Sequence, residues 1–122
     1  MSQAAVDTAA ALLTEARGLL LKGWSQGAQA RDETGRAVSA WSEDATSWSL
    51  LGALLASWQL HGMALEEDFV AHAIDARALG DATAALGDAT GTAALDQWND
   101  APDRTIGDVI DALNHALEEL PG

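Results

Sequence analysis

Residues 98–110 read Trp-Asn-Asp-Ala-Pro-Asp-Arg-Thr-Ile-Gly-Asp-Val-Ile, a stretch that ends one helix, turns and begins the next. Pro102 restricts the residue before it to extended conformations, which stops a helix at this point. Thr105 is followed by Asp108 at the third helical position, an arrangement that resembles a capping box. The stretch therefore predicts a C-terminal helix over residues 106–119 that packs an apolar face on the rest of the chain.

Two further helices are predicted by apolar residues that recur every three or four positions. The first covers residues 4–22 and ends at Gly23, because glycine favours helix termination. The second covers residues 43–60, with Ser42 as its N-cap and two acidic residues in its first turn. Its buried face is expected to carry Trp48, Leu51, Leu55 and Trp58.

A third helix is expected over residues 64–79. The sequence Leu-Gly-Asp-Ala-Thr then occurs twice within residues 79–90, at an interval too short for a solenoid repeat. We interpret it as a short helix over residues 81–86 between two glycine stops, followed by another that opens at Thr92 or the preceding glycine and ends at Trp98. The buried face of the third helix is expected to carry Leu65, Phe69, Val70, Ala73, Ala76 and Leu79.

Residues 24–38 lack a helical pattern and predict two short extended segments joined by a turn. Residues 32–35 read Asp-Glu-Thr-Gly, a turn signal, because glycine adopts a positive φ without steric cost. Two strands alone are marginally stable, so the hairpin must pack on the helices. The expected fold is mainly α: a compact bundle of four to five helices in one domain over residues 1–122, with a small β-hairpin between the first two helices.

The composition indicates an acidic protein with enough apolar residues to form a core. The 122 residues include 19 Asp and Glu against 6 Lys and Arg, which gives a net charge of −13, and 48% of them are hydrophobic. This balance opposes binding to the phosphate backbone of nucleic acid, which depends on Lys and Arg. Cysteine is absent, which excludes disulfides and thiolate chemistry.

The N-terminal region gives no sign of export. It contains Asp7 and Glu15 and no basic segment, so no signal peptide is expected. No apolar run reaches the ~18 residues that a membrane span needs. We therefore expect a cytoplasmic protein without membrane contact.

Three segments resemble a known family. They read Gly-Trp-Ser-Gln-Gly-Ala at residues 23–28, Trp-Ser-Leu-Leu-Gly-Ala-Leu at residues 48–54 and Trp-Asn-Asp-Ala-Pro at residues 98–102. Together they are similar to domain-of-unknown-function family 6197, whose members are small proteins of actinobacteria and their phages. Members often carry cysteine before the Gly-Ala pair, where this chain has Ser47 and Ser49, so a thiol role does not carry over. The resemblance implies a host range and no activity.

The polar residues around Trp98 form the first candidate site. In one interpretation, Asn99 ends a helix in the left-handed conformation and Asp100 holds the turn that follows. Arg104 then pairs with Asp100 or Asp103. In the other interpretation, a small ligand is bound by a polar cluster of Trp98, Asn99, Asp100 and Arg104.

A second candidate site consists of Trp24, Gly27 and Arg31. The glycine allows a ligand to approach the backbone, and Arg31 offers its charge to an anion or forms a surface ion pair. The pattern is not a P-loop, because no Gly-Lys-Ser/Thr follows it. If both candidates lie together, Trp24 and Trp98 become the walls of one pocket for a small ligand such as a nucleotide.

Two sets of acidic residues and histidine have spacings that suit metal ligands, although exposed acidic faces produce such sets by chance. Neither set matches His-Glu-x-x-His, and no Gly-x-Ser-x-Gly elbow marks a nucleophile. We expect no metal, no cofactor and no catalytic residue. The two sets are Asp68, His72 and Asp75, and Asp108, Asp111 and His115.

Five tryptophans stand in a chain that has one phenylalanine and no tyrosine. We expect Trp48 and Trp58 in the core, and at least one of Trp24, Trp41 and Trp98 exposed, because tryptophan is enriched at the centres of protein interfaces. The sequence favours a non-enzymatic interaction module that acts on a protein partner or by self-association. The alternative is a small-ligand pocket, and acidic mimicry of nucleic acid is the weakest interpretation.

Overall fold

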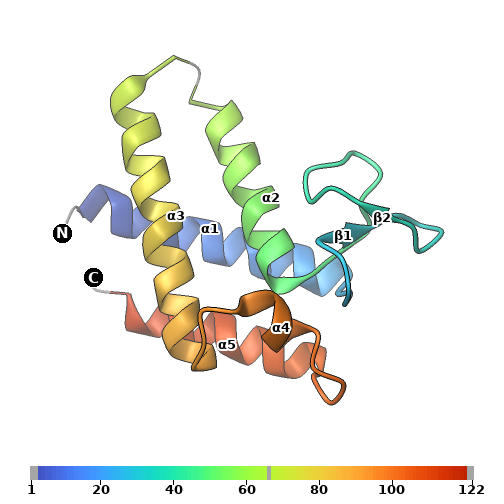
Figure 1. The fold of residues 1–122 in the computed structure, drawn as a ribbon. Coiled ribbons are helices and arrows are strands. Elements are labelled where there is room, and N and C mark those ends of the chain that lie inside the picture. The colour runs from blue at the N-terminus through green and yellow to red at the C-terminus, as the bar shows by residue number, and fades with distance from the viewer. Residues whose placement is uncertain (1–2, 66, 121–122) are drawn as a thin grey trace.

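The computed structural model describes residues 3–65 and 67–120, and helices make up most of it (Figure 1). The mainly α fold expected from the sequence is confirmed, with a small antiparallel sheet added to the helices. No helix in these two segments is both long and apolar enough to cross a membrane. In chain order the elements are α1 (Gln3–Lys22), β1 (Ala30–Arg31), β2 (Ala37–Val38), β3 (Ser47–Trp48), α2 (Leu50–Met63), α3 (Phe69–Thr90), α4 (Leu95–Asn99) and α5 (Ile106–Glu119).

The core lies where α1 meets α2, α3 and α5. Figure 1 shows α2 and α3 running in opposite directions across α1, with the turn between them at the far end from α4 and α5. Each fully buried leucine contributes about 2 kcal/mol through removal of apolar surface from water. The largest fully buried apolar side chains are Leu12, Leu13, Leu20, Leu50, Leu54, Leu86, Val109 and Leu113.

The expected hairpin is present, and it belongs to a sheet of three strands in the order β2-β1-β3. Its turn is held by Asp32, whose Oδ1 accepts hydrogen bonds from Thr34 N, Thr34 Oγ1 and Arg36 N. These bonds lower the pKa of Asp32 below its ordinary value, and the bond from the Thr34 hydroxyl has the largest effect. Gly35 has a φ of +86°, as the turn signal predicts.

The expected start of the second helix is wrong. Ser42 is not an N-cap, because its Oγ accepts from Asp44 N in a local turn, and α2 begins only at Leu50 with Ser49 as its N-cap. The intervening Ser47 and Trp48 form β3, which pairs with β1. Pairing with a strand far away in the sequence therefore overrides the helical spacing of the local apolar residues.

The two helices expected over residues 64–79 and 81–86 are one helix, α3, which runs through Gly80 and Gly87. A glycine inside a helix costs about 1 kcal/mol relative to alanine, and it ends the helix only where the chain also leaves helical geometry. That happens at Gly91, which has a φ of 78° and caps α3. The expected glycine stops are therefore wrong, and the helix is longer than predicted.

The expected buried face at the start of this helix is also wrong. Phe69 and Val70 are 87% and 70% exposed, and Ala73 and Ala76 are exposed as well. The N-terminal half of α3 extends beyond α5 toward the turn with α2, so less of the fold covers it (Figure 1). The residues of α3 that are buried are Asp75, Ala78, Ala82, Ala85 and Leu86.

The C-terminal part agrees closely with the prediction. The capping box is confirmed, since Thr105 Oγ1 accepts from Asp108 N at 3.2 Å and Asp108 Oδ2 accepts from Thr105 N at 3.0 Å. The short helix before it is α4, Leu95–Asn99, and it starts later than expected. Asn99 lies inside α4 instead of taking the left-handed conformation, and Ile106, the first residue of α5, is 37% exposed.

Candidate functional site

The six residues predicted as a binding site lie in segments that meet at one end of the molecule. Trp24 lies two positions after the end of α1 and forms a parallel bridge with Trp48, while Arg31 lies in β1. The other four residues belong to α4 and to the loop between α4 and α5. The structure therefore brings together segments separated by more than seventy positions, as the hydrogen bond between Trp24 and Asn99 shows.

Asn99 is the centre of this region and is fully buried. Its Oδ1 accepts hydrogen bonds from Trp24 Nε1 at 2.8 Å and from Leu50 N at 3.0 Å. Its Nδ2 donates to Ser25 O at 3.1 Å and to Asp100 Oδ1 at 3.0 Å. An amide side chain offers two donors and two acceptor lone pairs, so every hydrogen-bonding position of Asn99 is used.

Gln26, Gly27 and Asp100 extend the same network. Gln26 Nε2 donates to Asn99 O at 2.8 Å and to Ala101 O at 3.0 Å, and Gly27 N donates to Asp100 Oδ1 at 2.9 Å. Gly27 has a φ of 82°, which brings its N–H toward the carboxylate without a steric clash. We call the group Trp24, Gln26, Gly27, Asn99 and Asp100 the Asn99 clasp.

The two arginines lie beside the Asn99 clasp and bond to backbone carbonyls. Arg31 donates to Gln26 O from Nε and Nη2 and to Gly35 O from Nη1. Arg104 donates from Nε to Trp98 O at 2.8 Å, and its guanidinium carbon lies 3.9 Å from the centroid of the Trp98 ring. The expected pairing of Arg104 with Asp100 or Asp103 is therefore replaced by a carbonyl bond and a cation–π contact.

The geometry of the Asn99 clasp favours a structural role. The adjoining cavity measures about 120 Å³, well below the ~300 Å³ at which small-molecule sites begin. Ser25, whose carbonyl accepts from Asn99, has its Oγ buried without a partner among the described residues, and a lone hydroxyl is too little to orient a ligand. The side chains predicted to hold a ligand instead connect the N-terminus of α2, the loop after α1 and the loop after α4.

The two candidate metal sets are used differently. Asp68 caps α3 by accepting from Ala71 N, so it does not join Asp75, which lies inside the fold. In the second set, Asp108 belongs to the capping box, and His115 Nε2 lies 2.9 Å from Glu119. The described residues contain no group of three or more His, Cys, Asp or Glu that could hold a metal ion.

A partly buried hydrogen bond that the sequence did not predict joins α2 to α3. His61 Nδ1 lies 2.6 Å from Asp75 Oδ1, and the Asp75 side chain is only 3% exposed. Gly62 faces the other carboxylate oxygen: a Cβ on this glycine would lie 3.6 Å from Asp75 Oδ2. No residue that the structure describes donates a hydrogen bond to Oδ2.

A cavity of about 290 Å³ opens beside this carboxylate, between the end of α2 and the first half of α3. One wall is the half-buried Trp58, whose Nε1 is buried without a hydrogen-bond partner among the described residues. The buried Asp75 carboxylate and the side chain of Trp58 thus line the same small space. The lining residues are Trp58, Gln59, Gly62, Met63, His72 and Asp75.

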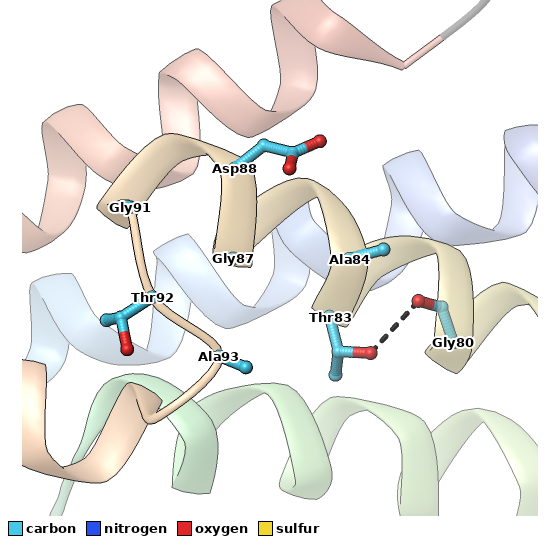
Figure 2. A pocket seen from close by; sticks show the side chains of 8 residues that line it. All are labelled: Gly80, Thr83, Ala84, Gly87, Asp88, Gly91, Thr92 and Ala93. Carbon is cyan, nitrogen blue, oxygen red and sulfur yellow. Dashed lines mark hydrogen bonds between the residues drawn. The ribbon is translucent and has the colours of Figure 1, made fainter.

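Three larger hollows lie elsewhere on the described residues, and one of them, of about 460 Å³, is lined by Asp81, whose Oδ2 is buried without a partner among these residues. The largest, of about 590 Å³, lies along the small residues of α3 and the segment Thr92–Ala93, and Figure 2 shows Asp88 and Thr83 projecting from different sides of the helix. Thr83 Oγ1 donates to Gly80 O, so its hydroxyl is used. The third, of about 450 Å³, lies between α1 and the end of α2.

The turn between α2 and α3 exposes large apolar side chains. Leu60 and Met63 lie at the end of α2, Phe69 and Val70 at the start of α3, and all four are at least 60% exposed. We call these four residues the α2–α3 tip. Large exposed apolar side chains scattered singly are common, whereas a group of them marks an interaction surface.

The tryptophans divide as the sequence analysis expects, with one difference. Trp48 is buried and its Nε1 donates to Ala40 O, and Trp41 is 55% exposed. Trp58 packs against the core but is only partly buried, as are Trp24 and Trp98. The exposed tryptophan is thus Trp41, which lies outside the α2–α3 tip.

The chain belongs to a family of unknown function, DUF6197, whose model matches residues 4–119. The family resemblance of the three sequence segments is thereby confirmed. No curated protein and no solved structure matches the chain significantly.

Proposed function

We propose that the protein is a non-enzymatic module that binds a protein partner through the α2–α3 tip. The observation that carries the proposal is the exposure of Leu60, Met63, Phe69 and Val70 at one end of the molecule. Apolar side chains at the centre of an interface supply most of the binding free energy once water is excluded from them.

The alternative, a small-ligand pocket at Trp24 and Trp98, has less support. The side chains of the Asn99 clasp are already hydrogen-bonded within the protein, and the adjoining cavity is too small for a nucleotide. Self-association is opposed by the net charge of −13 on each copy, which repels a second copy at low salt. The same charge favours a partner with basic residues.

Capture from a lysate tests the proposed function, and the family resemblance points to an actinobacterium or its phage-infected cells as the source. We expect the double variant Phe69→Ser/Val70→Ser to lose proteins that the parent retains. Leu21→Ser is the matched control, because Leu21 is 68% exposed on α1 and lies outside the tip. Equal capture by all three proteins would contradict the proposal.

Two further measurements separate the other interpretations. Sedimentation at increasing concentration should give a monomer, and a dimer that disappears in Phe69→Ser/Val70→Ser would replace the partner by a second copy. Mixed-sequence duplex DNA should not be retarded in a gel at about 150 mM salt, because six to ten phosphate contacts are typical and the chain has 6 Lys and Arg in total.

A further inference from the structure

We infer that the cavity beside Asp75 is the anchor pocket of the α2–α3 tip and that it receives one basic side chain, an arginine or a lysine, of the partner. This inference rests on the proposed function and adds the chemistry of the contact. It combines three observations on the same end of the molecule: a buried carboxylate with an unused oxygen, an aromatic wall and an exposed apolar rim.

The charge at the end of the cavity selects a cation. Asp75 is 97% buried at its side chain, and only its Oδ1 is engaged, by His61. The chain has no side chain at Gly62 to cover Oδ2, which leaves this oxygen facing the cavity. A carboxylate oxygen that accepts no bond inside the protein is best satisfied by a charged N–H donor, which forms a shorter and stronger hydrogen bond than a neutral one.

The walls suit the aliphatic and planar parts of such a side chain. Trp58 and Met63 line the cavity. A guanidinium or ammonium group over an indole ring gains cation–π stabilisation, and a flexible thioether adapts to methylene groups. At about 290 Å³ the cavity has room for one side chain and not for a drug-sized molecule. A longer segment must therefore remain outside the cavity.

The rim explains where the rest of the partner lies. Met63 lines the cavity and also belongs to the α2–α3 tip, so a side chain that enters the cavity brings its neighbours onto the tip. An amphipathic helix presents a basic residue and apolar residues on one face at spacings of three and four, which is the pattern that the cavity and the tip require. The net charge of −13 also steers a basic segment toward the protein.

The test uses two short labelled peptides that are identical except at one position. Both are amphipathic helices of leucine, alanine and glutamine, and the central residue of the apolar face is arginine in one and citrulline in the other. Citrulline keeps the shape of arginine and lacks its charge. We expect the parent protein to bind the arginine peptide about tenfold more tightly by fluorescence anisotropy, since one charged hydrogen bond supplies about this factor.

Two variants locate the discrimination at the cavity. Asp75→Asn should remove the preference for arginine and leave citrulline binding unchanged, whereas Asp88→Asn, which removes the same charge from an exposed position on α3, should keep the preference. If Asp75→Asn fails to fold, Gly62→Leu serves in its place, because it keeps the carboxylate, favours the helix and fills the cavity. It should weaken binding of both peptides and abolish the difference.

The outcomes separate the inference from the function on which it rests. An equal affinity of the parent protein for both peptides, no binding of either, or a preference that survives in Asp75→Asn would overturn the inference. If lysate partners are lost with Phe69→Ser/Val70→Ser and retained with Asp75→Asn, the tip is the interaction surface and the cavity is not its anchor. Loss of partners in both variants, with retention in Leu21→Ser, supports both statements.

Discussion

The Asn99 clasp and the α2–α3 tip lie at opposite ends of the fold, and the polar groups at the two ends differ in how fully they are hydrogen-bonded. At the clasp, Asn99 uses both donors and both acceptor positions within the protein. In the cavity beside the tip, Asp75 leaves one carboxylate oxygen without a hydrogen-bond donor among the described residues. A ligand could therefore form a new hydrogen bond with Asp75 beside the tip, whereas Asn99 at the clasp has no hydrogen-bonding position left.

This difference separates a structural cluster from a binding surface. A buried polar group that is fully bonded stabilises the fold and loses that contribution when a ligand competes for it. A carboxylate oxygen that faces a cavity and accepts no hydrogen bond inside the protein can still accept one from a ligand. The residue types alone, which suggested a ligand site at Trp98, do not distinguish the two cases.

The largest effect is expected at the Asn99 clasp. Asn99→Ala removes the partner of Trp24 Nε1, Leu50 N and Ser25 O at once. Buried groups left without partners cost about 1–3 kcal/mol each, so the free energy of unfolding should fall by about 4 kcal/mol in urea titrations. A fall below about 1 kcal/mol would mean that water replaces the amide and that the clasp is not structural.

Asn114→Ala is the matched control for this variant. Asn114 lies on α5 and its Oδ1 accepts one hydrogen bond, from Arg17 Nη1 at 2.7 Å, in a partly buried position. Alanine is also the better helix former, which offsets part of the loss. We expect the free energy of unfolding to change by no more than about 1 kcal/mol. Equal changes for Asn114→Ala and Asn99→Ala would contradict the structural role of the Asn99 clasp.

The next effect compares two tryptophans. Trp58→Ala should lower the free energy of unfolding by about 2 kcal/mol, since a fully buried tryptophan costs about 3–5 kcal/mol and Trp58 is only partly buried. Trp41→Ala should change it by less than about 0.5 kcal/mol, because Trp41 is 55% exposed. Coincident denaturation midpoints of the two variants would contradict the placement of Trp58 against the core.

The sequence predicts the parts of the fold that depend on neighbours in the chain. α5 and its capping box are correct because Thr105 and Asp108 specify that start by themselves. The start of α2 is not predicted, because Trp48 pairs with β1 and a helical apolar pattern cannot reveal a distant strand partner. The length of α3 is not predicted for a related reason. The packing of α3 on α1 and α5 keeps Gly80 and Gly87 helical, and the local sequence does not show that packing.

The candidate site is likewise predicted only in the parts that depend on neighbouring residues in the chain. The sequence picks out Asn99 and Asp100 as special, but their partners Trp24 and Gly27 lie far away in the chain, so their fully bonded state is not visible from spacing. The pair of His61 and Asp75 is not predicted, because spacing within one helix does not show a contact between two helices. Pairing residues across an antiparallel helical turn is the signal that could have found it.

A smaller effect tests the helix start that is predicted from neighbouring residues in the chain. Thr105→Ala should lower the free energy of unfolding by about 1 kcal/mol through loss of the N-cap hydrogen bond from Asp108 N. Thr83→Ala is the control, because Thr83 only donates to Gly80 O within α3 and alanine is the better helix former. We expect thermal melts in which only Thr105→Ala is destabilised, and overlaid melts would contradict the capping assignment.

The smallest effect on stability is expected at the α2–α3 tip, where the largest effect on binding is proposed. Phe69 and Val70 are 87% and 70% exposed, so the double change to serine removes little apolar surface that folding has buried. Valine and serine also differ little in helix propensity, which leaves a change within about 0.5 kcal/mol in urea titrations. A loss several times larger would mean that the two side chains already pack within the fold, and the tip would then be a poorly covered part of the core instead of a surface kept open for a partner.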